Sequence, residues 1–294
     1  MGKLDIHVHL ATQPCPVCFC AQERINFDRM MGIDRGILLS EPAAAGGCLE
    51  TDEAALQWAQ AAMGPMDAYA VSLRYPERFA WMCNVYLDGT AAPYEHLKRY
   101  KELGACGVGE FTQSLRLDDP QMERLFAWCQ ELELPFLFHM RAGGGAYGVV
   151  DLPGLPLLEG ALKKFPGVKF IGHSQPFWAE ISQHPADLTD GARGGYPSGR
   201  VVPGRVHQLL EGYGNLYGDL SADSGGNAIL RDPDHGLEFL ERFQDRLMYG
   251  SDTVASQSHY PLGLYLDSLL RQSKLSAEAY AKICRTNAER VFGI

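Results

Sequence analysis

The chain has 294 residues, of which 46% are hydrophobic, and this is enough for a large core and a usual length for one α/β barrel. No run of about twenty apolar residues predicts a membrane span, and the N-terminus lacks the pattern of a secretory signal. With 26 Lys and Arg against 36 Asp and Glu, the formal net charge of −10 excludes general nucleic-acid binding. We predict a single cytoplasmic domain over residues 1–294 that acts on a small molecule, and the sequence leaves a homo-oligomer open.

The first predicted strand reads "LDIHVHLA" at residues 4–11. Apolar and polar residues alternate along it, so His7 and His9 share one face while Ile6 and Val8 share the other. Two histidines on one face are typical either of a half-exposed strand or of a metal site, because imidazole is a common metal ligand.

Seven further apolar runs end in polar residues, and segments with helical spacing separate most of them. Strands that alternate with helices indicate βαβ units and a parallel sheet. Eight such units in this length predict a (β/α)₈ TIM barrel, with long loops after strands 1 and 6 at residues 11–22 and 175–200. An open, doubly wound sheet is the alternative, since periodicity alone does not show closure. The seven runs are 35–40, 78–87, 106–111, 135–140, 168–174, 215–221 and 247–252.

Polar residues gather where these predicted strands end, which is where parallel barrels carry their reactive groups. The set contains four histidines and two carboxylates, and this mixture suits Zn²⁺, with Mn²⁺ or Fe²⁺ as alternatives. Buried polar groups with ordinary hydrogen bonds are the other interpretation. The residues are His7, His9, Glu110, His139, His173 and Asp252.

Four short motifs and the C-terminus resemble the amidohydrolase superfamily. The motifs are "HVH" at the first strand, "LFHM" at the fifth, "IGHS" at the sixth and "YGSD" at the eighth. The closing "ICRTNAERVFGI" resembles the amidohydrolase-2 branch, which includes aminocarboxymuconate semialdehyde decarboxylase and several lactone hydrolases. The resemblance covers nearly the whole chain and is specific to a scaffold and a metal rather than to a substrate.

The resemblance also implies roles for the residues at the strand ends. His7, His9 and His139 match metal ligands, and Asp252 matches the carboxylate of the last strand. His173 matches a histidine that binds a second ion in binuclear members and lies beside the substrate in mononuclear ones. Glu110 stands where binuclear members have a bridging group, so it either bridges or binds an ion directly, or else it orients a ligand histidine.

We expect first a hydrolase of a small lactone, ester or amide. A bound metal lowers the pKa of water from 15.7 towards about 7, Asp252 would take the proton, and His173 would polarise the carbonyl. The alternative is a non-oxidative decarboxylase of the same branch, and a phosphoesterase ranks third. The number of bound ions would distinguish these two reactions, because two ions favour hydrolysis and one ion leaves decarboxylation open.

Three further residues are candidates for substrate binding. Arg141 follows His139 by two positions and could bind a carboxylate, although a pair with a loop acid is the alternative. Phe177 and Trp178, at the start of the long loop, could contact an aromatic substrate or could pack within the loop.

A cluster of three cysteines lies in the first long loop. Cys15 and Cys18 have the C-x-x-C spacing of zinc ligands, and Cys20 follows, but no second pair is nearby. We therefore favour packed, reduced thiols in a pocket-lining loop.

Overall fold

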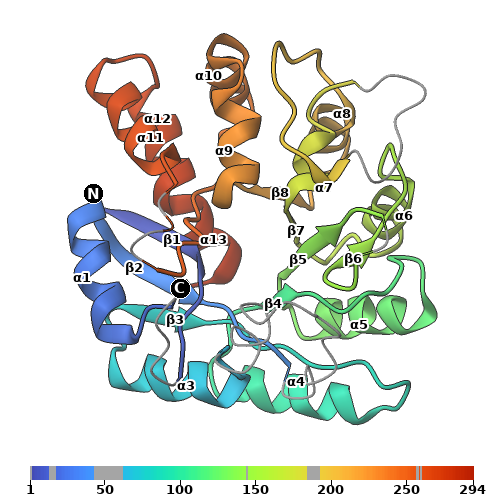
Figure 1. Cartoon of the computed structure of the whole chain (residues 1–294). Helices are drawn as coiled ribbons and strands as arrows, with labels where there is room; N and C mark the ends of the chain where they lie inside the picture. Colours follow the sequence, from blue (N-terminus) through green and yellow to red (C-terminus); the bar gives the residue numbers. More distant parts are fainter. Residues whose placement is uncertain are drawn as a thin grey trace.

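The computed structural model describes residues 2–12, 18–42, 62–143, 145–183, 193–255, 258 and 260–294. Strands and helices alternate along most of this chain, and Figure 1 shows the helices arranged around the outside of the strands. Within the described residues, no helix is both long enough and apolar enough to cross a bilayer. The strands are β1 (Lys3–Val8), β2 (Ile33–Leu38), β3 (Phe79–Trp81), β4 (Val108–Phe111), β5 (Phe136–Arg141), β6 (Val149–Val150), β7 (Phe170–His173), β8 (Leu216–Asp219) and β9 (Leu247–Met248). The helices are α1 (Ala21–Met31), α3 (Pro65–Arg74), α4 (Ala92–Glu102), α5 (Pro120–Glu131), α6 (Pro156–Lys164), α7 (Gln175–Ala179), α8 (Arg205–Gly212), α9 (Ala222–Leu230), α10 (Pro233–Arg242), α11 (Leu262–Arg271), α12 (Ala277–Ala281), the π-helical turn η2 (Lys282–Thr286) and α13 (Asn287–Phe292).

Main-chain hydrogen bonds close the strands into a barrel. The parallel strands form two arcs, β1-β2-β3 and β4-β5-β7-β8-β9. Cys83 joins the arcs after β3, because its N–H donates to the Gly107 carbonyl and its carbonyl accepts from Gly109, both at 2.9 Å. At the other junction the N–H of Ile6 donates to the Tyr249 carbonyl at 3.1 Å. The predicted TIM barrel is confirmed, and the open sheet is excluded.

Each of the eight predicted strands contains one barrel strand, but the last residues of several runs leave the sheet. The run at 78–87 pairs with β2 as far as Trp81 and then with Val108 through a single bridge at Cys83, after which polar Asn84 turns to other partners. Its side-chain amide donates to the carbonyls of Ser40 at 2.8 Å and Glu110 at 2.6 Å. The two-residue β6, which the sequence did not predict, pairs with the end of β5.

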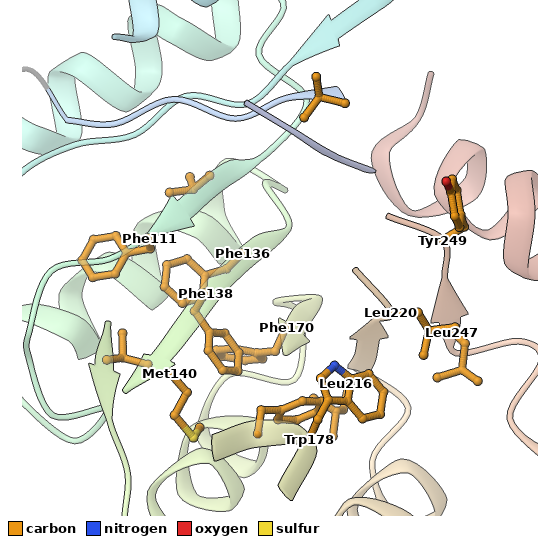
Figure 2. Packing of buried hydrophobic residues seen from close by; sticks show 14 of the residues in the cluster. Phe111, Phe136, Phe138, Met140, Phe170, Trp178, Leu216, Leu220, Leu247 and Tyr249 are labelled. Carbon is orange, nitrogen blue, oxygen red and sulfur yellow. The ribbon is translucent and has the colours of Figure 1, made fainter. Parts of the chain in front are cut away.

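Two hydrophobic layers fill the barrel wall. The inner one receives a residue from each strand or its flank, such as Ile37 and Leu137, and α13 adds Phe292. The outer one lies between strands and helices, and Figure 2 shows Phe136 and Phe170 within it. Alternate residues of a strand therefore face the interior and the helices, as the pleat requires.

The alternation is broken in β1. Ile6 belongs to the inner layer and Val8 to the outer layer, although a regular strand would place both on one face. The register between β1 and β2 shifts between Asp5 and Val8. His7 lies within this irregular stretch, and its side chain points towards the barrel interior. The sequence-based pairing of Ile6 with Val8 on one face is therefore corrected, and the irregularity aims His7 into the barrel.

Candidate metal centre

The six predicted site residues meet at one rim of the barrel. His7 and Glu110 lie within β1 and β4, His139 lies in β5, and His173 is the last residue of β7. Asp252 follows β9 after three residues. Because the strands are parallel, their C-terminal ends form a single rim, and residues 245 positions apart become neighbours.

Four of these side chains form a compact set of donors, which we call the His7 group: His7, His9, Asp252 and the Oε2 atom of Glu110. The two Nε2 atoms of the histidines are 3.1 Å apart. Glu110 Oε2 lies 3.7 Å from His7 Nε2 and 3.4 Å from His9 Nε2. Asp252 Oδ1 lies 3.5 and 3.6 Å from the same two nitrogens.

These separations fit a divalent metal ion. Metal–nitrogen and metal–oxygen bonds of about 2.1 Å in tetrahedral geometry place neighbouring ligand atoms about 3.4 Å apart. Two imidazoles and two carboxylates also form a donor set that Zn²⁺, Mn²⁺ and Fe²⁺ accept. His7, His9 and Asp252 could therefore hold one ion with little side-chain movement, and Glu110 Oε2 lies near both histidine nitrogens as a further donor.

The other oxygen of Glu110 faces a second set, the His139 group: His139, His173 and Glu110 Oε1. Glu110 Oε1 lies 2.8 Å from His139 Nδ1 and 3.6 Å from His173 Nε2. The shorter distance is that of an N–H···O hydrogen bond, in which the imidazole donates to the carboxylate. The resemblance assigns His139 as a metal ligand together with His7 and His9. In the structure His139 contacts the Oε1 atom of Glu110, whereas His7 and His9 lie near the Oε2 atom.

Two residues that the sequence analysis missed lie behind the histidines. Asp219, the last residue of β8, accepts a hydrogen bond from His7 Nδ1 at 2.6 Å, which leaves Nε2 free to bind an ion. Ser221 Oγ lies 3.2 Å from His7 Nδ1 and 2.9 Å from His173 Nδ1. Asp219 stands at the end of the predicted strand "NLYGDLS", so the strand-end signal that found the other six residues would also have found it.

We expect Asp219→Asn to weaken divalent-metal affinity by roughly 10- to 100-fold, because an amide does not hold His7 in the required tautomer as firmly as a carboxylate does. Metal titration monitored by calorimetry checks this, with Asp223→Asn on α9 as the control. Unchanged affinity in Asp219→Asn would show that His7 needs no such partner.

A buried ion pair holds the segments that carry His7 and Asp252. Arg24 on α1 pairs with Asp5, and it also donates to the Thr253 carbonyl at 3.1 Å. Asp5 in turn accepts from the backbone N–H of His7 at 3.0 Å. The start of the chain in β1 and the segment after β9 are therefore anchored to one charged pair.

Opposing effects set the protonation of the centre. Burial alone would lower the pKa of His7, but the carboxylates of Asp252, Asp219 and Glu110 raise it well above its usual value. Burial and the nearby His7 charge lower the pKa of His173 well below its usual value, so His173 is neutral. Burial would raise the pKa of Glu110, but His139 and His7 lower it well below the usual value, so Glu110 is ionised.

A pH dependence of metal binding follows from the raised pKa of His7. The metal-free protein holds this proton to a higher pH than the unfolded chain does, and a metal ion must displace it. Below that pKa, affinity should fall by about tenfold per pH unit for each proton displaced, so binding is weaker at about pH 6 than at about pH 8. Calorimetry in buffers of different ionisation enthalpy would detect the released proton, and an affinity constant across this range would contradict the expectation.

A second carboxylate network borders the Glu110 side chain. The Tyr147 hydroxyl lies 3.1 Å from Glu41 Oε1 and 3.3 Å from Glu110 Oε2. Burial and the neighbouring Glu110 raise the pKa of Tyr147 well above its usual value, so the phenol stays a hydrogen-bond donor. Glu41 directly follows the predicted strand at 35–40 and carries the same strand-end signal as Asp219.

A pocket of about 290 Å³ opens beside this network. His139, Arg141, Tyr147 and Gln175 contribute polar side chains to its lining. The Arg141 Nε atom is buried and has no hydrogen-bond partner within the described part of the chain. Arg141 therefore lines this pocket beside His139, and its role in substrate binding stays a prediction.

Phe177 and Trp178 lie elsewhere. Their side chains are 0% and 2% exposed and belong to the outer hydrophobic layer, where Figure 2 shows Trp178. Trp178 Nε1 donates to the Asp219 carbonyl at 2.8 Å. The chain forms α7 directly after β7, and this short helix turns both rings into the core instead of towards the pocket. The expectation that they contact substrate is therefore corrected, while the residues at 184–192 of the same loop lie outside the described part.

The cysteine cluster is described only in part, because Cys15 lies outside the described residues. Cys18 is buried in the protein interior, and Cys20 is the exposed N-cap of α1.

Comparison with known proteins decides the family. Residues 4–294 match the model of a family described as Amidohydrolase. The chain belongs to the amidohydrolase family. A comparison with curated proteins gives no match.

Solved amidohydrolase-like structures share the fold at low sequence identity. A 2,6-dihydroxybenzoate decarboxylase from Rhizobium is 18% identical with a TM-score of 0.60, over 99% of this chain and 98% of that one. A dihydroxybenzoic acid decarboxylase from a Polaromonas species, with bound manganese and 2-nitroresorcinol, is 17% identical with a TM-score of 0.61, over 99% and 97%. A 5-carboxyvanillate decarboxylase from Novosphingobium aromaticivorans, with manganese, is 19% identical with a TM-score of 0.57, over 92% and 80%.

Proposed function

We propose that this amidohydrolase is a metal-dependent, non-oxidative decarboxylase of a hydroxylated, monocyclic carboxylic acid. The observation that carries the proposal is the His7 group, whose donors could hold a divalent ion beside a pocket that Arg141 lines. The three solved structures described above are decarboxylases, two of them with bound manganese, and this favours decarboxylation over the hydrolysis that the sequence suggested first. It also makes Mn²⁺ the first metal to test, with Zn²⁺ as the second.

A divalent ion in the His7 group would supply a Lewis acid for the substrate oxygens. The reaction breaks the bond between a ring carbon and its carboxylate, CO₂ leaves, and the ring carbon gains a proton. Asp252 is placed to provide that proton, because its side chain is 22% exposed at the outer edge of the group while Glu110 is only 3% exposed. Water then returns a proton to Asp252.

Neutral His173 stands beside Asp252 and completes the reacting side of the site. Its Nε2 lies 3.9 Å from Asp252 Oδ2, whereas the Oδ1 atom is the one that lies near His7 and His9. Because the imidazole is uncharged, it can donate to or accept from a substrate oxygen without adding positive charge against the departing carboxylate. We therefore assign His173 to substrate orientation and Asp252 to proton transfer.

Product analysis with Mn²⁺-loaded protein tests the proposal. With 2,6-dihydroxybenzoate as the probe, we expect release of CO₂ and, in D₂O, one deuterium at the former carboxylate carbon. Asp252→Asn should abolish the reaction, and His96→Ala, an exposed residue on α4, should not affect it. Cleavage of lactones, esters or amides without CO₂ release from any hydroxylated benzoate would replace this proposal by the hydrolase.

One observation keeps hydrolysis as the second candidate. Glu110 directs one oxygen to the His7 group and the other to the His139 group, as a carboxylate that bridges two ions does. Two ions would take His173 as a ligand and leave it unable to orient a departing carboxylate.

A further inference from the structure

We propose that His207 on α8 and His235 on α10 form a second metal site, which takes a transition-metal ion such as Zn²⁺ and not Mn²⁺. Both helices lie on the outside of the barrel, so this site is separate from the His7 group and does not depend on the proposed reaction. It is carried by the geometry of the two imidazoles, by the rings that fix them and by the kind of donor they offer.

The two imidazoles point their Nε2 atoms at each other. His207 Nε2 lies 3.0 Å from His235 Nε2, which is close to the 3.1 Å between the Nε2 atoms of His7 and His9. In the metal-free protein this distance fits a hydrogen bond in which one imidazole donates to the other. An ion with bonds of about 2.1 Å would need the two nitrogens to separate to about 3.4 Å, a movement of roughly 0.4 Å. The pair could therefore exchange its hydrogen bond for an ion without rearrangement of either helix.

Aromatic rings hold both histidines in place. Phe239 lies edge to face against His207, with ring centroids 5.0 Å apart, and stacks against His235 at 5.8 Å. Phe243, at the C-terminal end of α10, packs against His207 at 5.7 Å. Side chains that are already fixed lose little conformational entropy when a ligand binds. The pair is therefore organised for metal binding before any ion arrives.

Both imidazoles are neutral at neutral pH, as metal ligands must be. Burial, together with the neighbouring His235, lowers the pKa of His207 to about 4. Burial also lowers the pKa of His235, against the opposing effect of the Asp232 and Glu238 carboxylates. Protons therefore compete little with an ion for the two nitrogens. His207 is 5% exposed and His235 is half-buried, so an ion would reach the pair from the side of His235.

The donors of this pair select the metal. Within the described part of the chain, no Asp, Glu or Cys side chain brings a third donor atom close to both nitrogens, so water would complete the coordination. Imidazole suits Zn²⁺, Cu²⁺ and Ni²⁺, whereas Mn²⁺ prefers the oxygens of carboxylates and water. The His7 group contains carboxylates and accepts Mn²⁺ as well, so the two sites should differ in metal selectivity.

The pair should bind Zn²⁺ roughly 10- to 100-fold more weakly than the His7 group does. Asp219 accepts a hydrogen bond from His7 Nδ1 and so orients His7 as a ligand. The buried Nδ1 of His235, in contrast, has no hydrogen-bond partner among the residues that the structure describes. Zn²⁺ would therefore fill the His7 group first and would then join α8 to α10.

Calorimetry with Zn²⁺ tests the site. In the parent protein we expect two classes of Zn²⁺ site, of which the weaker adds one equivalent per chain, and we expect no such weaker class with Mn²⁺. His235→Ala should lose the weaker class and keep the tighter one, and His235→Gln, which retains a polar side chain, should do the same. Excess Zn²⁺ should also raise the Tm of the parent beyond the effect of the first equivalent, but not that of His235→Ala. His96→Ala, on the exposed surface of α4, is the matched control and should keep both classes.

Anomalous diffraction at the zinc edge locates the ion. Crystals with excess Zn²⁺ should show a peak within about 2.2 Å of both Nε2 atoms, and crystals with Mn²⁺ should show none there. A weaker class that survives in His235→Ala and disappears in His173→Ala would place the second ion in the His139 group and overturn the inference. A single class of Zn²⁺ site in the parent would also overturn it, and His207 and His235 would then be a hydrogen-bonded pair only.

Discussion

Replacement of His9 or Asp252 by alanine should remove the tightly bound divalent ion and lower turnover by at least about 10²- to 10⁴-fold, the contribution of a single acid–base group alone. Each change takes one donor from the His7 group, whose nitrogen and oxygen atoms lie 3.1 to 3.7 Å apart. Three remaining donors bind a divalent ion less tightly, and the charge balance also shifts when Asp252 is lost. Loss of Asp252 removes the proposed proton donor as well, so this variant should stay inactive even at saturating metal.

Elemental analysis of the purified variants measures this directly. His96→Ala is the matched control, because it removes a histidine from the exposed surface of α4 and should keep one ion per chain. Circular dichroism establishes that each variant is folded before metal content is compared. Metal at the parent stoichiometry in both His9→Ala and Asp252→Ala would refute the assignment of the His7 group as the metal site.

Replacement of Glu110 should have the second-largest effect on metal binding, because its carboxylate contacts both the His7 group and the His139 group. Glu110→Gln keeps the size of the side chain but loses a negative charge, and we expect metal affinity to fall by roughly 10- to 100-fold. In crystals of the parent protein at full metal loading, anomalous diffraction should show one strong peak within about 2.2 Å of Glu110. His139 should then remain a hydrogen-bond donor to Oε1, since the 2.8 Å contact is already a hydrogen bond.

The number of peaks separates the two candidate reactions. A second peak between His139 and His173 would make Glu110 a bridge, as the sequence-based resemblance suggested, and would favour hydrolysis. A single peak more than about 3 Å from Glu110 would remove this residue from the ligands altogether. Thr112→Ser, on the hydroxyl that donates to Glu41 at 3.1 Å, is a conservative neighbour change that should leave the peak in place.

Much of the fold and part of the candidate site follow from local patterns. The apolar runs locate all eight barrel strands, because a buried parallel strand needs a continuous apolar segment wherever it lies in the chain. The strand-end rule brings six polar residues to one rim, because parallel strands in a barrel share one C-terminal face. The same rule applies to two further residues. Asp219 ends the run "NLYGD", and Glu41 directly follows the run "RGILLS".

Other features depend on contacts that no local pattern encodes. Phe177 and Trp178 have the composition of a pocket wall, yet α7 packs them against the core. The regular alternation of "LDIHVHLA" places Ile6 with Val8, but the register shift in β1 separates them. In both cases, burial of apolar area against distant elements outweighed the local periodicity.

The sequence by itself determined the alternation of strands and helices, the donor types at the strand ends and the family, because these depend on residue identity and on spacing within one element. Only the tertiary structure decided that the barrel closes at Cys83 and Ile6, since this requires hydrogen bonds between segments from different parts of the chain. It also decided the partners of each donor: one oxygen of Glu110 faces His9 and the other faces His139. Side-chain pairing across a rim depends on distances of a few ångströms between separate strands, and the order of residues along a strand does not specify those distances.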